Sequence, residues 1–262
     1  MNERFKVVVT GATGMVGEGV LHECLKHPGI EKVLFVGRKS CGVQHEKLTE
    51  VMLGDFLNPE QIANQLFNYD ACLFCLGVSS LGMKEEEYRK LTYLLTTGFA
   101  KTFLKTNPGS SFVYVSGAGT DSSERGKSMW ARIKGQTENE LLSMGFRQAY
   151  MFRPGYIQPA AGMKFTIPMY RYVKWSYPFL RKAFPKYVSA LEEIGLAMIH
   201  CIRNGYQKNI LEVSDINDAA AREHQWLRNP IIPEKTIEDV NNEESRSGIL
   251  PDRDLKKNLG CG

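Results

Sequence analysis

Three glycines spaced three residues apart are the first sign of chemistry in this sequence. Gly11, Gly14 and Gly17 follow a strand-like stretch, residues 6–9, with three consecutive valines, and they open a segment typical of a helix. This spacing lets the backbone turn sharply and approach a pyrophosphate closely, while the helix packs on the strand before it. Unpaired N–H groups and the positive end of the helix then attract an anion. The stretch therefore predicts a nucleotide-binding turn.

A pair of basic residues bears on which dinucleotide would bind. The strand expected over residues 32–36 ends at Gly37, and Arg38 and Lys39 follow it. In a dinucleotide-binding fold this position contacts the adenosine ribose, where a carboxylate favours NAD and a cation favours the additional phosphate of NADP. Two bases without an acid predict NADP(H) as the cofactor. The alternative is an exposed loop with two solvated charges.

Two further strand ends carry residues that suit a dinucleotide. Residues 47–53 are typical of a strand, and Asp55 and Phe56 follow it. Asp55 either accepts a hydrogen bond from the adenine amino group or forms a turn. Residues 70–76 are typical of another strand, after which Gly77 would let the cofactor pass close to the backbone.

Alternating strands and helices must position these residues. The expected strands cover residues 6–10, 32–36, 47–53, 70–76, 111–115, 148–152 and 209–213, and the expected helices cover 15–26, 59–67, 84–105, 128–144 and 191–203. Such alternation predicts an α/β fold, a Rossmann-type doubly wound parallel sheet with helices on both faces.

The composition is ordinary for a globular protein and sets few limits. The 262 residues are 43% hydrophobic and 24% charged, with a formal net charge of +4, which gives no reason to expect a nucleic-acid partner. No apolar segment precedes the first strand, and no apolar run approaches the roughly 20 residues of a membrane-spanning helix. We therefore expect a cytoplasmic protein with one main domain over residues 1–217.

The six cysteines do not form a disulfide pattern. Cys72 and Cys75 have the spacing of a redox pair but lie in an expected strand, where residues three apart point to opposite faces. We expect buried structural cysteines, and no metal site.

Four stretches of the chain resemble one superfamily. Thr10–Gly17 has the T-G-x-x-G-x-x-G form of atypical, epimerase-like short-chain dehydrogenases/reductases, the NAD(P)-dependent epimerase/dehydratase superfamily. Residues 37–39, 75–77 and 152–155 are similar to their counterparts in its Tat-interacting-protein-like oxidoreductases. The resemblance covers about residues 5–213 and implies an NADP(H)-binding fold.

The resemblance also implies a Tyr-x-x-x-Lys pair on the helix after the fifth strand. Residues four apart share a face of a helix, so the lysine can hold the nicotinamide ribose and lower the tyrosine pKa toward the working pH. Here Lys134 is present, but Trp130 occupies the tyrosine position. Because an indole N–H does not titrate in a useful range, Trp130 cannot serve as the acid or base.

Three residues are the catalytic candidates that remain. Lys134 is expected to clamp the ribose, Ser116 to supply a hydroxyl at the fifth strand end, and Tyr156 to replace the missing acid from a loop that should face the nicotinamide. Ala118 stands where epimerase-like members often carry the hydroxyl. A literal Tyr-x-x-x-Lys at residues 170–174 lies outside the helix that the motif requires.

Sixteen positions make up the expected cofactor site. They are Gly11, Thr13, Gly14, Met15, Val16, Gly17, Arg38, Lys39, Asp55, Phe56, Leu76, Gly77, Val78, Lys134, Pro154 and Ile157.

The second half of the chain changes in character. Residues 141–191 contain eight Lys or Arg residues, many aromatic residues and no Asp or Glu. The resemblance implies a small cap here, over about residues 159–190, and an aromatic and basic cap suits an anionic or flat small-molecule substrate. The same residues would also suit peripheral contact with an anionic membrane, or aromatics packed beneath a solvated basic face. Residues 218–262 are polar and are expected to be a poorly ordered or adjunct tail.

Two functions follow from these patterns. The first is an NADP(H)-dependent oxidoreductase or epimerase-like enzyme that acts on a small carbonyl or hydroxyl substrate. The second is a regulatory or sensor protein that binds NADP(H) without catalysis. Trp130 favours the second, whereas the expected cofactor site fits both.

Overall fold

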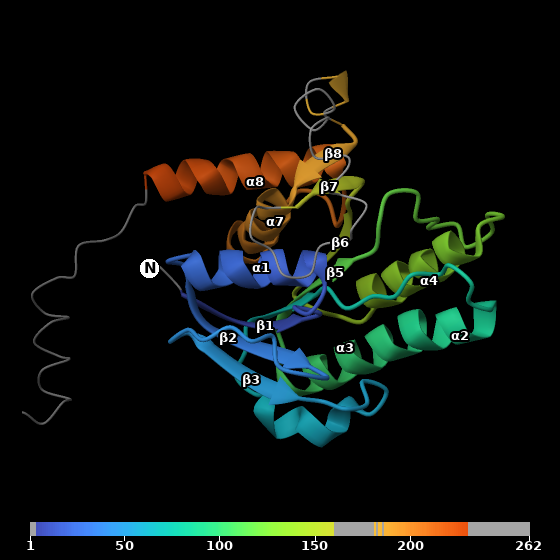
Figure 1. Ribbon diagram of the computed structural model, residues 1–262, viewed down its shortest axis with the longest axis horizontal. Helices are drawn as coiled ribbons and strands as arrows, with labels where there is room; N and C mark the ends of the chain where they lie inside the picture. Colours follow the sequence, from blue (N-terminus) through green and yellow to red (C-terminus); the bar gives the residue numbers. More distant parts are fainter. Residues whose placement is uncertain (1–3, 160–180, 182, 185, 230–262) are drawn as a thin grey trace, which may run out of the picture. The chain divides into compact units, whose positions relative to one another are not determined.

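A seven-stranded parallel sheet forms the centre of the computed structural model, which describes residues 4–159, 181, 183–184 and 186–229 (Figure 1). From one edge to the other its strands are β3 (Leu48–Met52), β2 (Ile30–Gly37), β1 (Phe5–Thr10), β4 (Ala71–Phe74), β5 (Ser111–Val115), β6 (Gln148–Arg153) and β9 (Ile210–Glu212). The strand order reverses between β1 and β4, as in dinucleotide-binding folds. The expected Rossmann-type α/β fold is confirmed.

Helices cover both faces of this sheet, which explains why its strands are nearly continuous apolar runs. One face carries α1 (Met15–Lys26), α7 (Leu191–Asn204) and α8 (Val213–Arg228). The other carries the 3₁₀ helix η1 (Pro59–Gln65), α2 (Glu85–Arg89), the π-helical turn η2 (Lys90–Leu94), α3 (Leu95–Thr106) and α4 (Met129–Ser143). Side chains of β1 alternate between the two cores: Val7 and Val9 join the first, and Val8 joins the second.

The carboxyl ends of the strands meet at one edge of the sheet. Thr10 lies opposite both Val36 and Phe74, and Tyr114 lies opposite both Phe74 and Met151. The residues that follow each of these strands are therefore neighbours at that edge.

Two helical segments differ from the sequence-based prediction. The helix expected over residues 84–105 is interrupted by η2, where the Thr97 hydroxyl donates to the Tyr93 carbonyl oxygen at 2.8 Å. Hydroxyls that bond back to a carbonyl in this way compete with the regular helical ladder. The helix expected over residues 59–67 is a 3₁₀ helix.

The predicted boundary at residue 217 falls inside α8. This helix buries Ala219, Ala220 and Glu223 against the rest of the domain, and the packed unit extends to Asn229. Most polar residues of α8, apart from the buried Asp215 and Glu223, lie on its outer side, so average composition hid the buried face. The rest of the expected tail, residues 230–262, lies outside the described residues.

The cap region contributes a second, small sheet. Its strands are β7 (Tyr156–Gln158) and β8 (Val188–Ala190), which pair in parallel. Most of the expected cap, residues 160–180 with 182 and 185, lies outside the described residues.

The cysteines of the described chain are free thiols. Cys72 lies in one core and Cys75 packs against the other, so the two thiols face opposite sides of the sheet as predicted. Burial raises the pKa of Cys75 to about 12 and also raises that of Cys72.

Candidate functional site

The three glycines of the predicted turn meet different steric demands. Gly11 has a φ of +73°, and a Cβ there would lie 2.7 Å from the backbone of Cys75 and Leu76. A Cβ on Gly17 would lie 2.2 Å from the Gly11 carbonyl oxygen. These two glycines therefore allow the turn to pack against β4 and against α1.

Gly14 faces open space instead. A Cβ there would meet only the Gly11 carbonyl oxygen, at 3.4 Å. Gly14 is the N-cap of α1 and has no side chain to occupy the first N–H groups of that helix. An anion can thus approach a helix N-terminus whose donors are not capped by a side chain. Thr13, Met15 and Val16 are partly exposed around it.

Arg38 and Lys39 lie at the same edge, next to the glycine turn. Both side chains are exposed, and β2 ends beside β1 at the pair formed by Thr10 and Val36. A Cβ on Gly37 would lie 2.3 Å from the Phe35 ring, so the turn that presents these cations needs a glycine. Their position agrees with a contact to the adenosine side of a dinucleotide.

The loop after β3 gives a different result. Asp55 Oδ1 accepts from the Leu57 N–H at 2.9 Å, and Asp55 Oδ2 accepts from the Asn58 side chain at 2.6 Å. Both carboxylate oxygens therefore serve the turn, which is the alternative to adenine binding. Phe56 is 3% exposed and stacks on Phe99, so its side chain is a packing group.

The remaining expected cofactor residues divide into open and buried ones. A Cβ on Gly77 would have no atom within 4 Å, so a ligand can approach its backbone, and Leu76 and Val78 flank it without being fully buried. Ile157 is instead part of the core, and Pro154 is buried, with its carbonyl oxygen accepting from Ala118 N–H at 2.9 Å. The side chains of Pro154 and Ile157 are therefore packing groups.

Trp130 and Lys134 lie one helical turn apart at the start of α4. The Trp130 ring packs on Gly119, where a Cβ would lie 3.5 Å from it. The Lys134 ammonium group donates to the Ser116 carbonyl oxygen at the end of β5. Burial lowers the pKa of Lys134 to about 8, and the negative charge of Glu138 partly opposes that shift.

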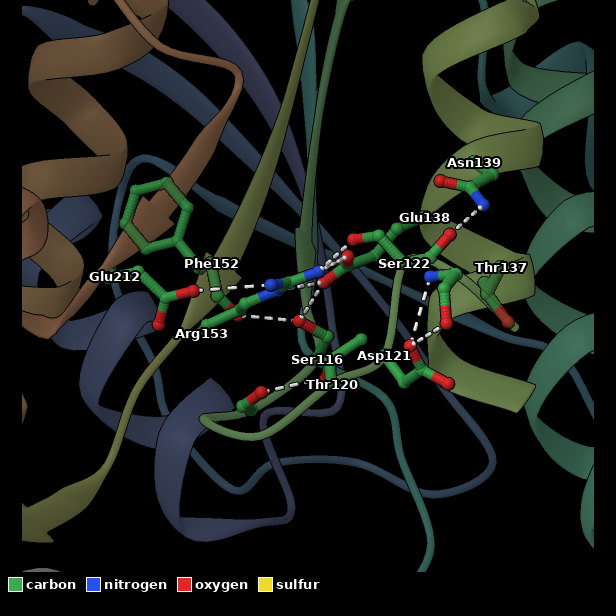
Figure 2. A network of polar contacts seen from close by, with 12 residues as sticks. Ser116, Thr120, Asp121, Ser122, Thr137, Glu138, Asn139, Phe152, Arg153 and Glu212 are labelled. Atoms are coloured by element: carbon green, nitrogen blue, oxygen red, sulfur yellow. Dashed lines mark hydrogen bonds and ion pairs between the residues drawn. The ribbon is translucent and has the colours of Figure 1, made fainter. Parts of the chain in front are cut away.

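A buried ion pair lies behind Ser116 (Figure 2). Arg153 on β6 donates to both carboxylate oxygens of Glu138 on α4, whose side chain is fully buried. Ser116 Oγ lies 2.5 Å from Glu138 Oε1 and 3.1 Å from the Phe152 carbonyl oxygen. A hydroxyl has one hydrogen, and the carboxylate is the nearer, charged acceptor, so Ser116 donates to Glu138.

This geometry bears on the catalytic role expected of Ser116, which stays a prediction. Ser116 is 4% exposed, and its hydroxyl bonds to the buried Glu138. The hydroxyl is therefore committed to a structural contact, and a catalytic role would require breaking it.

Tyr156 lies on β7 and not in an open loop. Its hydroxyl donates to Gln158 Oε1 at 3.0 Å, and its N–H donates to the Tyr187 carbonyl oxygen. These contacts tie the side chain to the small second sheet.

Glu138 is the site residue that the sequence analysis missed. Its position four residues after Lys134 places both on one face of α4, which was a usable signal. Its partner Arg153 is at the end of another strand, and only the tertiary structure brings the two together.

The comparison with known families finds a match in the first half of the chain. Residues 7–120 match the family described as the NAD dependent epimerase/dehydratase family. The matched region runs from β1 to the loop after β5 and includes the glycine turn. The resemblance to atypical short-chain dehydrogenases/reductases is confirmed, while the Tat-interacting-protein-like subgroup stays a prediction.

Curated relatives of this domain come from fungi. "Protein fmp52-1, mitochondrial" of Aspergillus terreus is 27% identical over 157 residues, which cover 58% of this chain and 66% of that protein. "Protein FMP52, mitochondrial" of Candida albicans is 25% identical over 151 residues, 56% of this chain and 65% of that protein. The matched region spans slightly less than two thirds of either relative.

The names of these relatives contradict the cytoplasmic location expected from the sequence, and that prediction is wrong. It relied on the lack of an apolar leader. Mitochondrial targeting segments are amphipathic and basic, so an apolar criterion does not detect them.

Solved structures share the fold at low sequence identity. WbmF of Bordetella bronchiseptica, in complex with NAD+, superposes with a TM-score of 0.59 and 14% identity, over 88% of this chain and 80% of that one. A short-chain dehydrogenase of Burkholderia cenocepacia, in complex with NADP, gives a TM-score of 0.56 and 17% identity, over 95% and 100%. Domains of this fold thus bind either nicotinamide dinucleotide.

Neither a membrane-spanning helix nor a metal-binding cluster occurs among the described residues. No helix in them is long and apolar enough to cross a bilayer. No group of three His, Cys, Asp or Glu side chains in this part of the chain could hold a metal ion.

Proposed function

We propose that this chain is an NADP(H)-dependent oxidoreductase or epimerase-like enzyme that acts on a small carbonyl or hydroxyl substrate. The observation that carries the proposal is the glycine turn, whose open Gly14 side faces the edge where the strand order reverses. The turn and the start of α1 would hold the pyrophosphate, and Lys134 would hold the nicotinamide ribose. The nicotinamide supplies hydride chemistry when it is bound.

Preference for NADP(H) rests on Arg38 and Lys39, and the Arg38→Ala variant tests it. Loss of a charge-assisted contact to a phosphate is expected to weaken NADPH binding by about 10-fold to 100-fold, with little change in NADH binding. Titrations with both dinucleotides give the ratio. Lys32→Ala, an exposed lysine toward the other end of β2, is the matched control. An unchanged NADPH-to-NADH ratio in Arg38→Ala would contradict the preference.

The substrate class is proposed from the cap. Phe184 and Tyr187 are exposed, and Lys186 lies between them. Aromatic faces beside a cation suit an anionic or flat aromatic substrate. The same exposed groups would support peripheral contact with an anionic membrane, which flotation with anionic vesicles and a Phe184→Ser, Tyr187→Ser variant would detect.

A second candidate function is NADP(H) binding without catalysis. Trp130 in the tyrosine position and the commitment of the Ser116 hydroxyl to Glu138 favour this reading. NADPH oxidation against a panel of carbonyl compounds, with wild type and Trp130→Tyr, separates the two. Turnover by the wild type supports the enzyme, whereas turnover that appears only in Trp130→Tyr supports the sensor.

We also propose a mitochondrial location, because the curated relatives carry mitochondrial names. Cell fractionation with antibody detection of the untagged protein tests it. Recovery outside the mitochondrial fraction would remove the proposal.

A further inference from the structure

Lys134 is held by a chain of contacts that runs through Ser116 and Glu138 to Arg153. The Lys134 ammonium group donates to the Ser116 carbonyl oxygen, and the Ser116 hydroxyl donates to Glu138. Glu138 in turn accepts two hydrogen bonds from Arg153. These contacts join α4 to the ends of β5 and β6, and Figure 2 shows the part formed by Ser116, Glu138 and Arg153.

We propose that Glu138, held in place by Arg153, is a positioning residue for the cofactor site: its carboxylate holds the Ser116 hydroxyl, and through Ser116 it fixes the carbonyl oxygen that accepts from the Lys134 ammonium group. The inference rests on the proposed function, in which Lys134 holds the nicotinamide ribose. Neither Glu138 nor Arg153 needs to touch the cofactor.

The surroundings of Lys134 single out Glu138 as its charge partner. Glu138 lies one turn further along the same helix, and it is the charged group that raises the pKa of Lys134. On the neighbouring elements, Arg153 donates to Glu138 and also to Glu212. Asp121 is bonded within its own turn, to Ser123 and Gly126. Burial alone would favour the neutral amine.

Stability is a poor explanation for this buried pair. The free-energy cost of removing two charges from water offsets most of their mutual attraction. Well-packed apolar residues would therefore serve a structural role equally well. The Arg153 guanidinium group is also fixed from other sides, by Ser122 Oγ at 2.5 Å and Glu212 Oε1 at 3.2 Å. Together these contacts of Arg153 fix the orientation of the Glu138 carboxylate, and through it the orientation of Ser116.

The test compares Glu138→Gln with a matched control, Glu223→Gln. Glu223 is equally buried and pairs with Arg203, His27 and His200. His27 follows the end of α1 opposite to the glycine turn, about 18 Å away along the 12-residue helix. Both variants remove one buried carboxylate charge that pairs with an arginine, but only one of them acts on Lys134.

Two measurements are made on the full-length proteins. The first is the titration of Lys134, followed by the ¹³Cε signal of labelled lysine and assigned by its loss in Lys134→Arg. The second is the NADPH dissociation constant at about pH 7.5, below the value near which Lys134 loses its proton. In Glu138→Gln we expect the lysine to titrate at clearly lower pH than in the wild type and NADPH binding to weaken about 10-fold. In Glu223→Gln the Lys134 titration should match that of the wild type, and the NADPH dissociation constant should stay within about 2-fold of the wild-type value.

Several outcomes would overturn the inference. One is an unchanged titration and affinity in Glu138→Gln, and another is an equal loss in Glu223→Gln. If Glu138→Gln does not fold, Ser116→Ala removes only the hydroxyl that Glu138 holds, and an unchanged NADPH affinity in that variant contradicts the inference. Absence of NADPH binding by the wild type would instead overturn the proposed function, while the lysine titration would still report on Glu138.

Discussion

At the scale of single residues, the charge of Lys134 bears on the proposed cofactor site. An ordinary lysine is almost fully charged at about pH 8, but burial lowers the pKa of Lys134 to about 8. The Lys134 side chain is therefore mostly positively charged below this pH, and it loses that charge above it. A site that depends on this charge is sensitive to pH in the range where most enzymes work.

NADPH affinity should consequently fall as the pH rises from about 7 to about 9. In the proposed cofactor site the protonated lysine would donate to the ribose and attract the phosphates, whereas the neutral amine would do neither as well. Isothermal titration across this range measures the effect. Lys134→Arg, which keeps its charge, should lack the dependence, and Lys134→Met should bind about 10-fold more weakly at about pH 7. The same pH profile in Lys134→Arg as in the wild type would assign the effect to another group.

At the scale of elements, the junction of β1 and α1 depends on a close approach. The Gly11 carbonyl oxygen occupies the space that a Cβ on Gly17 would need. The turn cannot move away easily, because Gly11 itself is packed against the backbone of Cys75 and Leu76. The shape of the glycine turn is thus set by the helix and strand that it joins.

Gly17→Ala is expected to lower the free energy of unfolding by about 1–3 kcal/mol and to weaken NADPH binding, because the added methyl group must displace the turn. Gly98→Ala is the matched control: Gly98 lies within α3 with no atom within 4 Å of a Cβ position, so alanine should stabilise by about 0.5–1 kcal/mol. Urea unfolding measures the stability of the two variants, and NADPH titration measures their affinity. Equal stability and equal NADPH affinity of the two variants would show that the close contact at Gly17 does not constrain the turn.

The elements near this junction were predictable because their signals are local. Residues 15–26 and 111–115 have the bounds that the sequence predicts for α1 and β5. The short strands β7 and β8 carry no such signal, since three residues are too few to show a period. The pairing of Glu138 with Arg153 was also hidden, because a contact between a helix and a strand depends on how the two pack.

At the scale of the whole domain, a second buried carboxylate, that of Glu223, holds α8 against its neighbouring helices. Glu223 of α8 faces His27 after α1 and both His200 and Arg203 of α7, and Trp226 stacks on His27 and Arg203. These contacts unite the ends of three helices on one face of the sheet. Stability of the domain therefore depends on residues beyond the predicted boundary at 217.

Glu223→Gln should lower the free energy of unfolding by about 3–5 kcal/mol at about pH 7, because it leaves Arg203 without its buried partner. The partners of Glu223 lower its pKa to about 2, below the usual value of 4.5. Its contribution is therefore complete above about pH 4.5 and is lost as the pH falls toward about 2. Denaturant unfolding between neutral pH and about pH 3 should show this loss in the wild type and less of it in Glu223→Gln. The same loss of unfolding free energy with falling pH in both proteins would contradict the assignment of this loss to Glu223.

The π-helical turn between α2 and α3 has an evolutionary consequence. A π turn holds one residue more than an α turn, so Lys90–Leu94 has the form of a one-residue insertion within a helix. Deleting one residue there would rotate α2 by about 100° relative to α3 and carry the buried Tyr88 away from its present surroundings. We expect relatives that lack this insertion to show a single-residue gap between 90 and 94, together with a different residue in place of Tyr88. The turn is thus a marker by which the descent of this branch can be traced in alignments.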